Sequence, residues 1–219
     1  MPSPALIWPI PALADGRQPI VSSGFAGRRT IPWRNPATGK METRTIPHGG
    51  VDLDYRAAAG DPPYLGRPSA TRTLRCYGPL GVPVLAVAGG MVTVAGWYDY
   101  GGGILVRERA GPVVWFYAHL STLAVKPGQV VEQGAYLGEM GGSTRGGESG
   151  FRHVHLSRLA RGTFPSQEDP EPYLRSARVW SWAAAQASKL RGGPVPGGAG
   201  PAGLAVVALL ALAVALALG

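Results

Sequence analysis

Glycine and proline are so frequent in this chain that long regular helices can occupy little of it. The 219 residues include 33 Gly and 21 Pro, and both residue types mark turns and interrupt helices. Only 16% of the residues are charged, against roughly 25% in a typical globular chain. This composition predicts short strands joined by frequent turns. We therefore expect a mainly β fold.

Short apolar runs with the character of strands concentrate between residues 49 and 159. The runs 82–88 and 91–97 are split by Gly89-Gly90, which is the pattern of a hairpin. A second antiparallel pair is predicted for 103–108 and 113–119. A strand and turn are expected at 21–29, and further short strands at 125–131, 135–140 and 153–159.

The segments around this β region suggest a division of the chain. Residues 1–20 carry several prolines and are predicted to form an extended arm that lies on the domain. The domain itself is expected at 21–165. Residues 55–80 within it are predicted to form an inserted loop, and loops of this length are usually functional or disordered.

The C-terminal part changes character twice. A helical extension is expected at 166–191, with its helix at about 171–190, and a Gly/Pro linker follows at 192–203. Residues 204–218 are an unbroken run of Leu, Ala and Val. A helix of 15 residues is roughly 22 Å long, short of the ~30 Å hydrocarbon core, but residues 199–203 bring it close to a span. Because the run has no polar face, we predict a transmembrane helix at 204–218.

The net charge of +8 favours an anionic partner, such as an acidic cell-wall polymer or an anionic lipid surface. Nucleic acid is the weakest of the candidates, because the basic residues are scattered rather than clustered, and we expect no nucleic-acid partner. An excess of Arg, Ala, Gly and Pro is equally typical of a GC-rich genome. The charge alone therefore selects no partner.

The chain has a single cysteine, Cys76, and four histidines. One cysteine excludes an intrachain disulfide and a zinc site built from several thiolates. A metal ion would have to be held by histidines and carboxylates. With so few histidines, their spacing is informative.

The histidines fall into three short motifs, and one motif includes an aspartate. His48 and Asp52 are four residues apart across a Gly-Gly pair. His153 and His155 alternate in a strand-like run, which places both imidazoles on one face. His119 follows an apolar run and can reach the same cleft. Taken singly, each motif is weak, since an isolated His-x-His pair is more often structural than catalytic.

Neutral imidazole and carboxylate groups bind zinc at about 2.0–2.2 Å, and a catalytic zinc has three protein ligands and one open position. His48, Asp52 and one of the pair His153/His155 would fill that set, and spacing alone leaves the choice open. The other two histidines could transfer a proton and stabilise an oxyanion. Zinc lowers the pKa of a bound water towards about 7. The combination suits peptide-bond hydrolysis.

In the same order, these motifs resemble those of the lysostaphin-type zinc metallopeptidases. The residues concerned are His48-x-x-x-Asp52, Tyr117-Ala118-His119-Leu120 and His153-Val154-His155. The sequence around these motifs is also similar to that of the family. The similar segments are Gly81-Val82-Pro83-Val84, Ala88-Gly89-Gly90-Met91-Val92, the turn at 125–134, Gly142-Ser143-Thr144, and the start at Ser22-Ser23-Gly24-Phe25. The resemblance covers about residues 21–160.

The resemblance implies an antiparallel, lysostaphin-like barrel-sandwich-hybrid fold, with one Zn²⁺ in a groove of the peptidase domain at 21–165. It implies that His48, Asp52 and His155 are the metal ligands, and that His119 and His153 are catalytic. The usual substrates of the family are peptide cross-bridges or stem peptides of bacterial peptidoglycan. The chain departs from the family pattern in the insertion at 55–80 and in Leu156-Ser157-Arg158, which replaces aromatic and acidic residues.

The predicted location follows from the two ends of the chain. The N-terminus lacks the basic region of a secretory signal peptide, and Lys189 and Arg191 precede the apolar run, a flank that tends to stay cytoplasmic. A cellular enzyme anchored in this way would face away from the wall. We therefore favour an enzyme of a bacteriophage virion, anchored in an internal membrane, with the bacterial envelope as the alternative.

Other classes of protein are less consistent with the motifs. The main alternative is a non-catalytic wall-binding or structural module on the same fold, although no expected ligand or catalytic histidine is missing. A biotinyl- or lipoyl-type carrier would need a modified lysine in a hairpin and would leave the histidines unexplained. A helical zincin is excluded, since the chain has no His-Glu-x-x-His motif.

Overall fold

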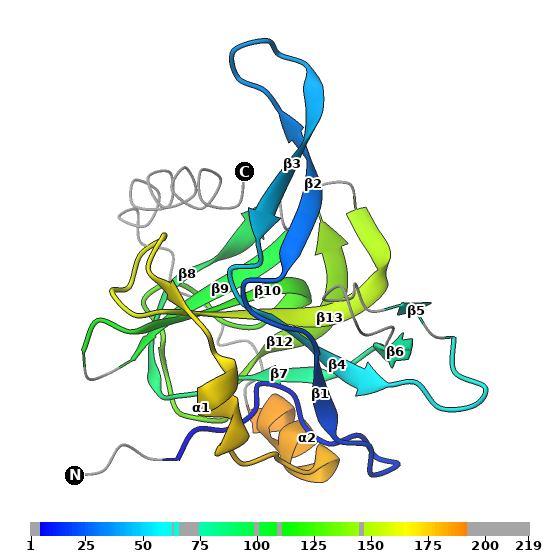
Figure 1. Ribbon diagram of the computed structural model, residues 1–219. Coiled ribbons are helices and arrows are strands. Elements are labelled where there is room, and N and C mark those ends of the chain that lie inside the picture. Colours follow the sequence, from blue (N-terminus) through cyan, green and yellow to red (C-terminus); the bar gives the residue numbers. More distant parts are fainter. Residues whose placement is uncertain are drawn as a thin grey trace.

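A computed structural model of the protein describes residues 5–62, 64–65, 75–98, 101–108, 111–144 and 147–191 (Figure 1). The predicted linker at 192–203 and the predicted transmembrane helix at 204–218 lie outside these residues, as does part of the loop predicted at 55–80. Among the helices that are described, none has both the length and the apolar character that a membrane crossing requires.

Antiparallel strands dominate the described part of the chain, which confirms the predicted fold class. They form a 12-stranded sheet with the main order β11-β8-β9-β10-β12-β13-β4-β6-β5, to which β1, β7 and β14 are added on β4, β12 and β13. The bounds are β1 Pro19–Ser23, β4 Val51–Arg56, β5 Tyr64–Leu65, β6 Arg75–Tyr77, β7 Pro83–Leu85, β8 Gly90–Tyr98, β9 Gly101–Glu108, β10 Val114–Leu123, β11 Val130–Val131, β12 Tyr136–Thr144, β13 Gly147–Leu159 and β14 Gln167–Glu168.

Strand β10 organises the sheet, because it pairs with β9, β12 and β13. Its apolar residues Trp115 and Tyr117 are fully buried in the main core, together with Leu53 of β4 and Val154 of β13. Burying a large apolar side chain contributes about 1.5–3 kcal/mol. The backbone N–H of Val87 donates a 2.9 Å hydrogen bond to the Tyr117 hydroxyl, which satisfies that buried oxygen. The core thus fixes the strands that carry the histidine motifs.

The predicted hairpin of runs 82–88 and 91–97 is wrong. Strand β7 pairs with β12, whereas β8 pairs with β9 and β11. Gly90 is required by packing and not by a turn, since a Cβ there would lie 2.0 Å from the carbonyl oxygen of Arg107 on β9. The second predicted pair is confirmed, because β9 and β10 are antiparallel neighbours.

The single helix predicted at 171–190 is also wrong, because it is divided into α1, Glu171–Arg175, and α2, Trp182–Arg191. The backbone between the two helices pairs with the N-terminal segment. Arg178 donates its N–H to Leu6 and accepts one from Trp8, and Trp180 accepts one from Ala12. These bonds replace the bonds that a continuous helix would make.

The N-terminal segment is anchored by buried side chains. Ile7 and Ile10 are fully buried, and the carbonyl of Pro9 accepts a 2.7 Å hydrogen bond from Leu85 of β7. Strand β1 begins at Pro19, within the stretch for which an extended arm was predicted. The segment and the two helices lie together at one end of the molecule (Figure 1).

A separate hairpin projects from the opposite end of the sheet (Figure 1). It consists of β2, Arg28–Arg34, and β3, Met41–Pro47, which form their own two-stranded sheet. The strand and turn predicted at 21–29 span the end of β1, the turn that follows it and the start of β2. The hairpin ends at Pro47, directly before His48.

Candidate metal centre and active site

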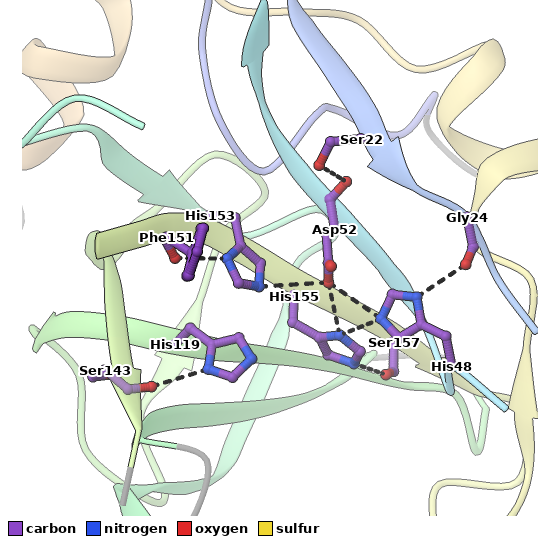
Figure 2. Close-up of polar contacts among 10 residues, drawn as sticks. All are labelled: Ser22, Gly24, His48, Asp52, His119, Ser143, Phe151, His153, His155 and Ser157. Atoms are coloured by element: carbon purple, nitrogen blue, oxygen red, sulfur yellow. Dashed lines mark hydrogen bonds and ion pairs between the residues drawn. The ribbon is translucent and has the colours of Figure 1, made fainter. Parts of the chain in front are cut away.

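Two neighbouring strands bring the central residues of the site together. Asp52 on β4 lies opposite His155 on β13 in the antiparallel register. His48 lies in the turn that precedes β4, and its ring nitrogen Nδ1 is 2.9 Å from the carbonyl oxygen of Gly24. All three residues are buried, with 3 to 6% of their surface exposed. Figure 2 shows the three side chains converging.

The three side chains present their donor atoms to one point. His48 Nε2 is 2.9 Å from His155 Nδ1, and each of these nitrogens is 3.2 Å from Asp52 Oδ1. A tetrahedral zinc ion with bonds of about 2.0–2.1 Å separates its ligand atoms by roughly 3.3 Å. The observed triangle is therefore close to one face of such a coordination sphere, and the trio is a metal-compatible group.

The hydrogen bonds on the far side of each ring agree with this arrangement. The carbonyl of Gly24 can only accept, so His48 donates through Nδ1 and a neutral ring carries its lone pair on Nε2. His155 Nε2 is 2.9 Å from the hydroxyl oxygen of Ser157, which can accept a proton from that nitrogen. The lone pair of His155 then lies on Nδ1, facing Asp52. Hydrogen bonds of this kind, made by the ring nitrogen that faces away from the metal, orient metal-binding histidines.

The electrostatics keep these groups in the forms that bind metals. Burial lowers the pKa of His155 to about 3, so its ring is neutral near pH 7. Burial of Asp52 opposes its ionisation, but attraction to His153 and the close polar contacts with His155 and His48 outweigh that effect and hold its pKa well below the usual value. A carboxylate and neutral imidazoles are the ligand forms that a divalent cation needs.

His119 reaches the cluster through an irregularity in β10. The register with β9 shifts between Tyr117 and Leu120, and His119 has a φ of +64°. Its Nδ1 is 3.0 Å from the carbonyl oxygen of Ser143, so this nitrogen donates. The ring centroid of His119 is 4.7 Å from that of His153 and 6.1 Å from that of His155.

His153 lies on the same face of β13 as His155. Its Nδ1 donates to the carbonyl oxygen of Phe151 at 2.9 Å, and its Nε2 is 3.6 Å from Asp52 Oδ1. That Nε2 is buried and has no hydrogen-bond partner among the described residues. The five residues predicted from the sequence thus lie in one cluster: His48, Asp52 and His155 form the triangle, and His119 and His153 flank it (Figure 2).

Several supporting groups had no predicted role. Ser157 follows His155 by two residues on the same face of β13, so the strand period could have indicated it. The carbonyls of Gly24 and Ser143 gave no signal in the sequence. At Gly50, a Cβ would lie 2.3 Å from the carbonyl oxygen of Leu156 and 2.8 Å from His155 Nε2. Only glycine leaves β13 room to approach the turn after His48.

The comparison with protein families agrees with this geometry. Residues 71–164 match the sequence model of peptidase family M23. This part of the chain is therefore similar to the peptidase domains of family M23. The match includes His119, His153 and His155, while His48 and Asp52 precede it. The resemblance to the lysostaphin-type metallopeptidases is thereby confirmed.

The relatives of this part of the chain include lysostaphin and a peptidoglycan endopeptidase. Lysostaphin of Staphylococcus simulans is 40% identical over 101 residues, which cover 45% of this chain and 20% of lysostaphin. The peptidoglycan DD-endopeptidase ShyB of Vibrio cholerae is 30% identical over 141 residues, which cover 64% of this chain and 25% of ShyB. The chain therefore spans a quarter or less of the length of these two relatives.

A solved structure supports the fold alone. A chain of the SpoIIQ–SpoIIIAH pore-forming complex aligns with a TM-score of 0.53 at 17% identity, over 83% of this chain and 95% of that chain.

Proposed function

We propose that the protein is a zinc-dependent endopeptidase that hydrolyses peptide bonds in the stems or cross-bridges of bacterial peptidoglycan. The observation that carries the proposal is the triangle of His48 Nε2, Asp52 Oδ1 and His155 Nδ1, with two further imidazoles beside it. In this proposal the three triangle residues hold one zinc ion. His119 and His153 act on the substrate and the attacking water.

A bound zinc ion would supply a Lewis acid for the scissile carbonyl and would favour ionisation of the attacking water. The chemistry of the donor set fits zinc, because imidazole nitrogens and a carboxylate oxygen are ligands that zinc accepts, and the three donor atoms are buried close together. His48 and His155 are held in orientation by Gly24 and Ser157.

The flanking histidines are oriented for proton transfer. Each donates through Nδ1 to a backbone carbonyl, that of Ser143 for His119 and that of Phe151 for His153. In a neutral ring this leaves the lone pair on Nε2, which can accept a proton from water and return it to the leaving amine. A protonated ring can donate to the oxyanion of the tetrahedral intermediate. With centroids 4.7 Å apart, the two rings can reach the same reacting group.

Two observations support peptidoglycan as the substrate. The relatives of the domain include a protein named as a peptidoglycan endopeptidase, and the net charge of +8 suits a polymer that carries carboxylates.

Digestion of purified peptidoglycan tests the proposal. Mass spectrometry of the soluble products should show new peptide ends that disappear when a chelator is added and return with zinc. The His119→Ala variant should bind the wall without producing these ends. Wall binding by the wild-type protein without any new ends would support the non-catalytic module, and ends that persist after metal removal would contradict the zinc mechanism.

The location of the enzyme is a separate proposal. A virion-associated enzyme, anchored in a membrane through residues 204–218, would reach the wall at entry without export from the cell. Cell fractionation and proteomics of purified virions would test it. Detection of the protein only in the envelope of uninfected bacteria would contradict it.

A further inference from the structure

Strand β3 of the β2–β3 hairpin contributes little to the core. In the described part of the chain these strands pair only with each other, and six of the seven residues of β3 are exposed. An isolated two-stranded hairpin is marginally stable in water. A strand as exposed as β3 is better explained by what it contacts than by what it stabilises.

The hairpin carries a concentration of positive charge. Residues 28–47 contain five basic residues and one acidic residue, a net charge of +4 out of the +8 of the whole chain. Arg28, Lys40 and Arg44 are exposed. The acidic residue, Glu42, accepts hydrogen bonds from the turn residues Asn35 and Thr38 at 2.9 and 3.4 Å. Its carboxylate is thus partly occupied within the hairpin.

The root of the hairpin is joined to the proposed metal centre. His48 accepts a backbone hydrogen bond from Ala26 and donates one to Gly27, both at 2.8 Å, so the antiparallel ladder continues to the metal-binding residue. The imidazole of the same residue bonds to Gly24. Arg28 pairs with Pro47, the residue before His48, so a group bound to Arg28 lies close to the proposed metal centre, whereas Lys40 lies at the far end of the hairpin.

We propose that residues 28–47 form a cationic arm that binds carboxylates of the peptidoglycan stem peptides beside the site of cleavage. This inference rests on the proposed function. Guanidinium and ammonium groups form charge-assisted hydrogen bonds with carboxylates, and a cluster of one charge sign raises the local concentration of an oppositely charged partner. The arm supplies binding to the polymer and takes no part in the bond-breaking step.

Sedimentation with insoluble peptidoglycan that has been stripped of teichoic acid tests the arm. The full chain is used with a chelator, so that binding is measured without cleavage. Replacing Arg28, Lys40 and Arg44 by Gln should weaken binding about 10-fold in low salt. The difference should disappear at about 0.5 M salt, where the Debye length is only a few ångströms.

A matched control removes the same charge elsewhere. Arg161, Arg178 and Arg191 are exposed and lie outside the hairpin, and their replacement by Gln should leave binding at the wild-type level. Equal losses in both triple variants, no loss in the hairpin variant, or wild-type binding only to walls that retain teichoic acid would overturn the proposal. If the triple variant melts at a lower temperature than the wild type, Lys40→Gln in the exposed turn should still weaken binding about twofold.

Cleavage of a short, soluble, uncharged peptide that contains the scissile bond separates this proposal from the proposed function. The hairpin variant should cleave it at the wild-type rate. If the wild type cleaves no peptide but still binds walls through the hairpin, the peptidase function fails and the arm stands. If cleavage is normal and wall binding is independent of the hairpin, the arm fails and the peptidase function stands.

Discussion

The two halves of the histidine cluster differ in how firmly they are held. In the triangle, His48 and His155 are buried to 3% and 6% exposure, and both ring nitrogens of each have a partner. In the flanking pair, the His153 side chain is 16% exposed, and its Nε2 has no hydrogen-bond partner in the described structure. Strand β13 supplies one residue to each half, two positions apart. The difference suggests that one half determines whether an ion is bound, and the other determines how fast the substrate reacts.

The largest loss of zinc binding and activity is expected when a residue of the triangle is replaced. Asp52→Asn removes the only charge among the three donors while keeping the shape of the side chain, so bound zinc should be lost together with activity. Elemental analysis after dialysis measures the bound zinc, and the release of peptides measures the activity. Asp54→Asn, at the other buried carboxylate of β4, is the matched control and should retain zinc. Zinc retained in Asp52→Asn would remove the distinction between the halves.

A smaller loss is expected in the flanking pair. His119→Ala and His153→Ala should each lower kcat by about 10²–10⁴-fold, the usual contribution of general acid–base catalysis. Zinc content should stay at the wild-type level, because neither residue belongs to the triangle. If either variant loses its zinc, that histidine belongs to the binding half.

Loss of the hydrogen bond between Ser157 and His155 should have a smaller effect than loss of a flanking histidine. Ser157→Ala removes the hydroxyl that orients His155, and losses of this kind typically cost about 10–100-fold in metal affinity. Competition with a chromophoric chelator measures the affinity. Ser157→Thr, which keeps the hydroxyl, should recover most of it, and kcat at saturating zinc should change little in both variants. An unchanged affinity in Ser157→Ala would show that the strand alone orients His155.

The smallest effect concerns acid stability of the metal-free protein. The pKa of His155 is about 3 in the folded chain and about 6.5 in an unfolded one, so the unfolded state binds more protons between these values. Stability should therefore fall as the pH drops from about 6.5 towards 3, by at most about 1.4 kcal/mol per pH unit. Asp52, whose pKa is lowered, adds to the loss below about pH 4. Urea unfolding at several pH values measures the slope, and His155→Gln should flatten it above pH 4.

Strand periodicity and short motif spacing were enough to predict which side chains of the site lie together. The alternation of His153 and His155 predicts two imidazoles on one face, and the structure places both beside Asp52. The spacing of His48 and Asp52 across two glycines predicts that their side chains converge, and His48 Nε2 is 3.2 Å from Asp52 Oδ1. Local geometry of this kind depends on a few neighbouring residues, so a motif can encode it.

Features that depend on distant partners could not be predicted. The pairing of β7 with β12 is made by residues about 50 positions apart, and the Gly89-Gly90 pair resembles a turn although Gly90 is packed against β9. The break between α1 and α2 results from hydrogen bonds to the N-terminal segment, which no helix pattern reveals. The bulge that directs His119 towards the cluster also has no signature in residues 113–119.

The backbone of His119 has a consequence for the evolution of this enzyme. A φ of +64° is a left-handed conformation that costs a residue with a Cβ roughly 1 kcal/mol or more. Glycine would adopt it without that penalty, so selection for thermal resistance alone would favour losing the imidazole. If His119 acts as proposed, keeping a histidine there exchanges stability for turnover, and a relative that is no longer catalytic would be expected to change at this position early.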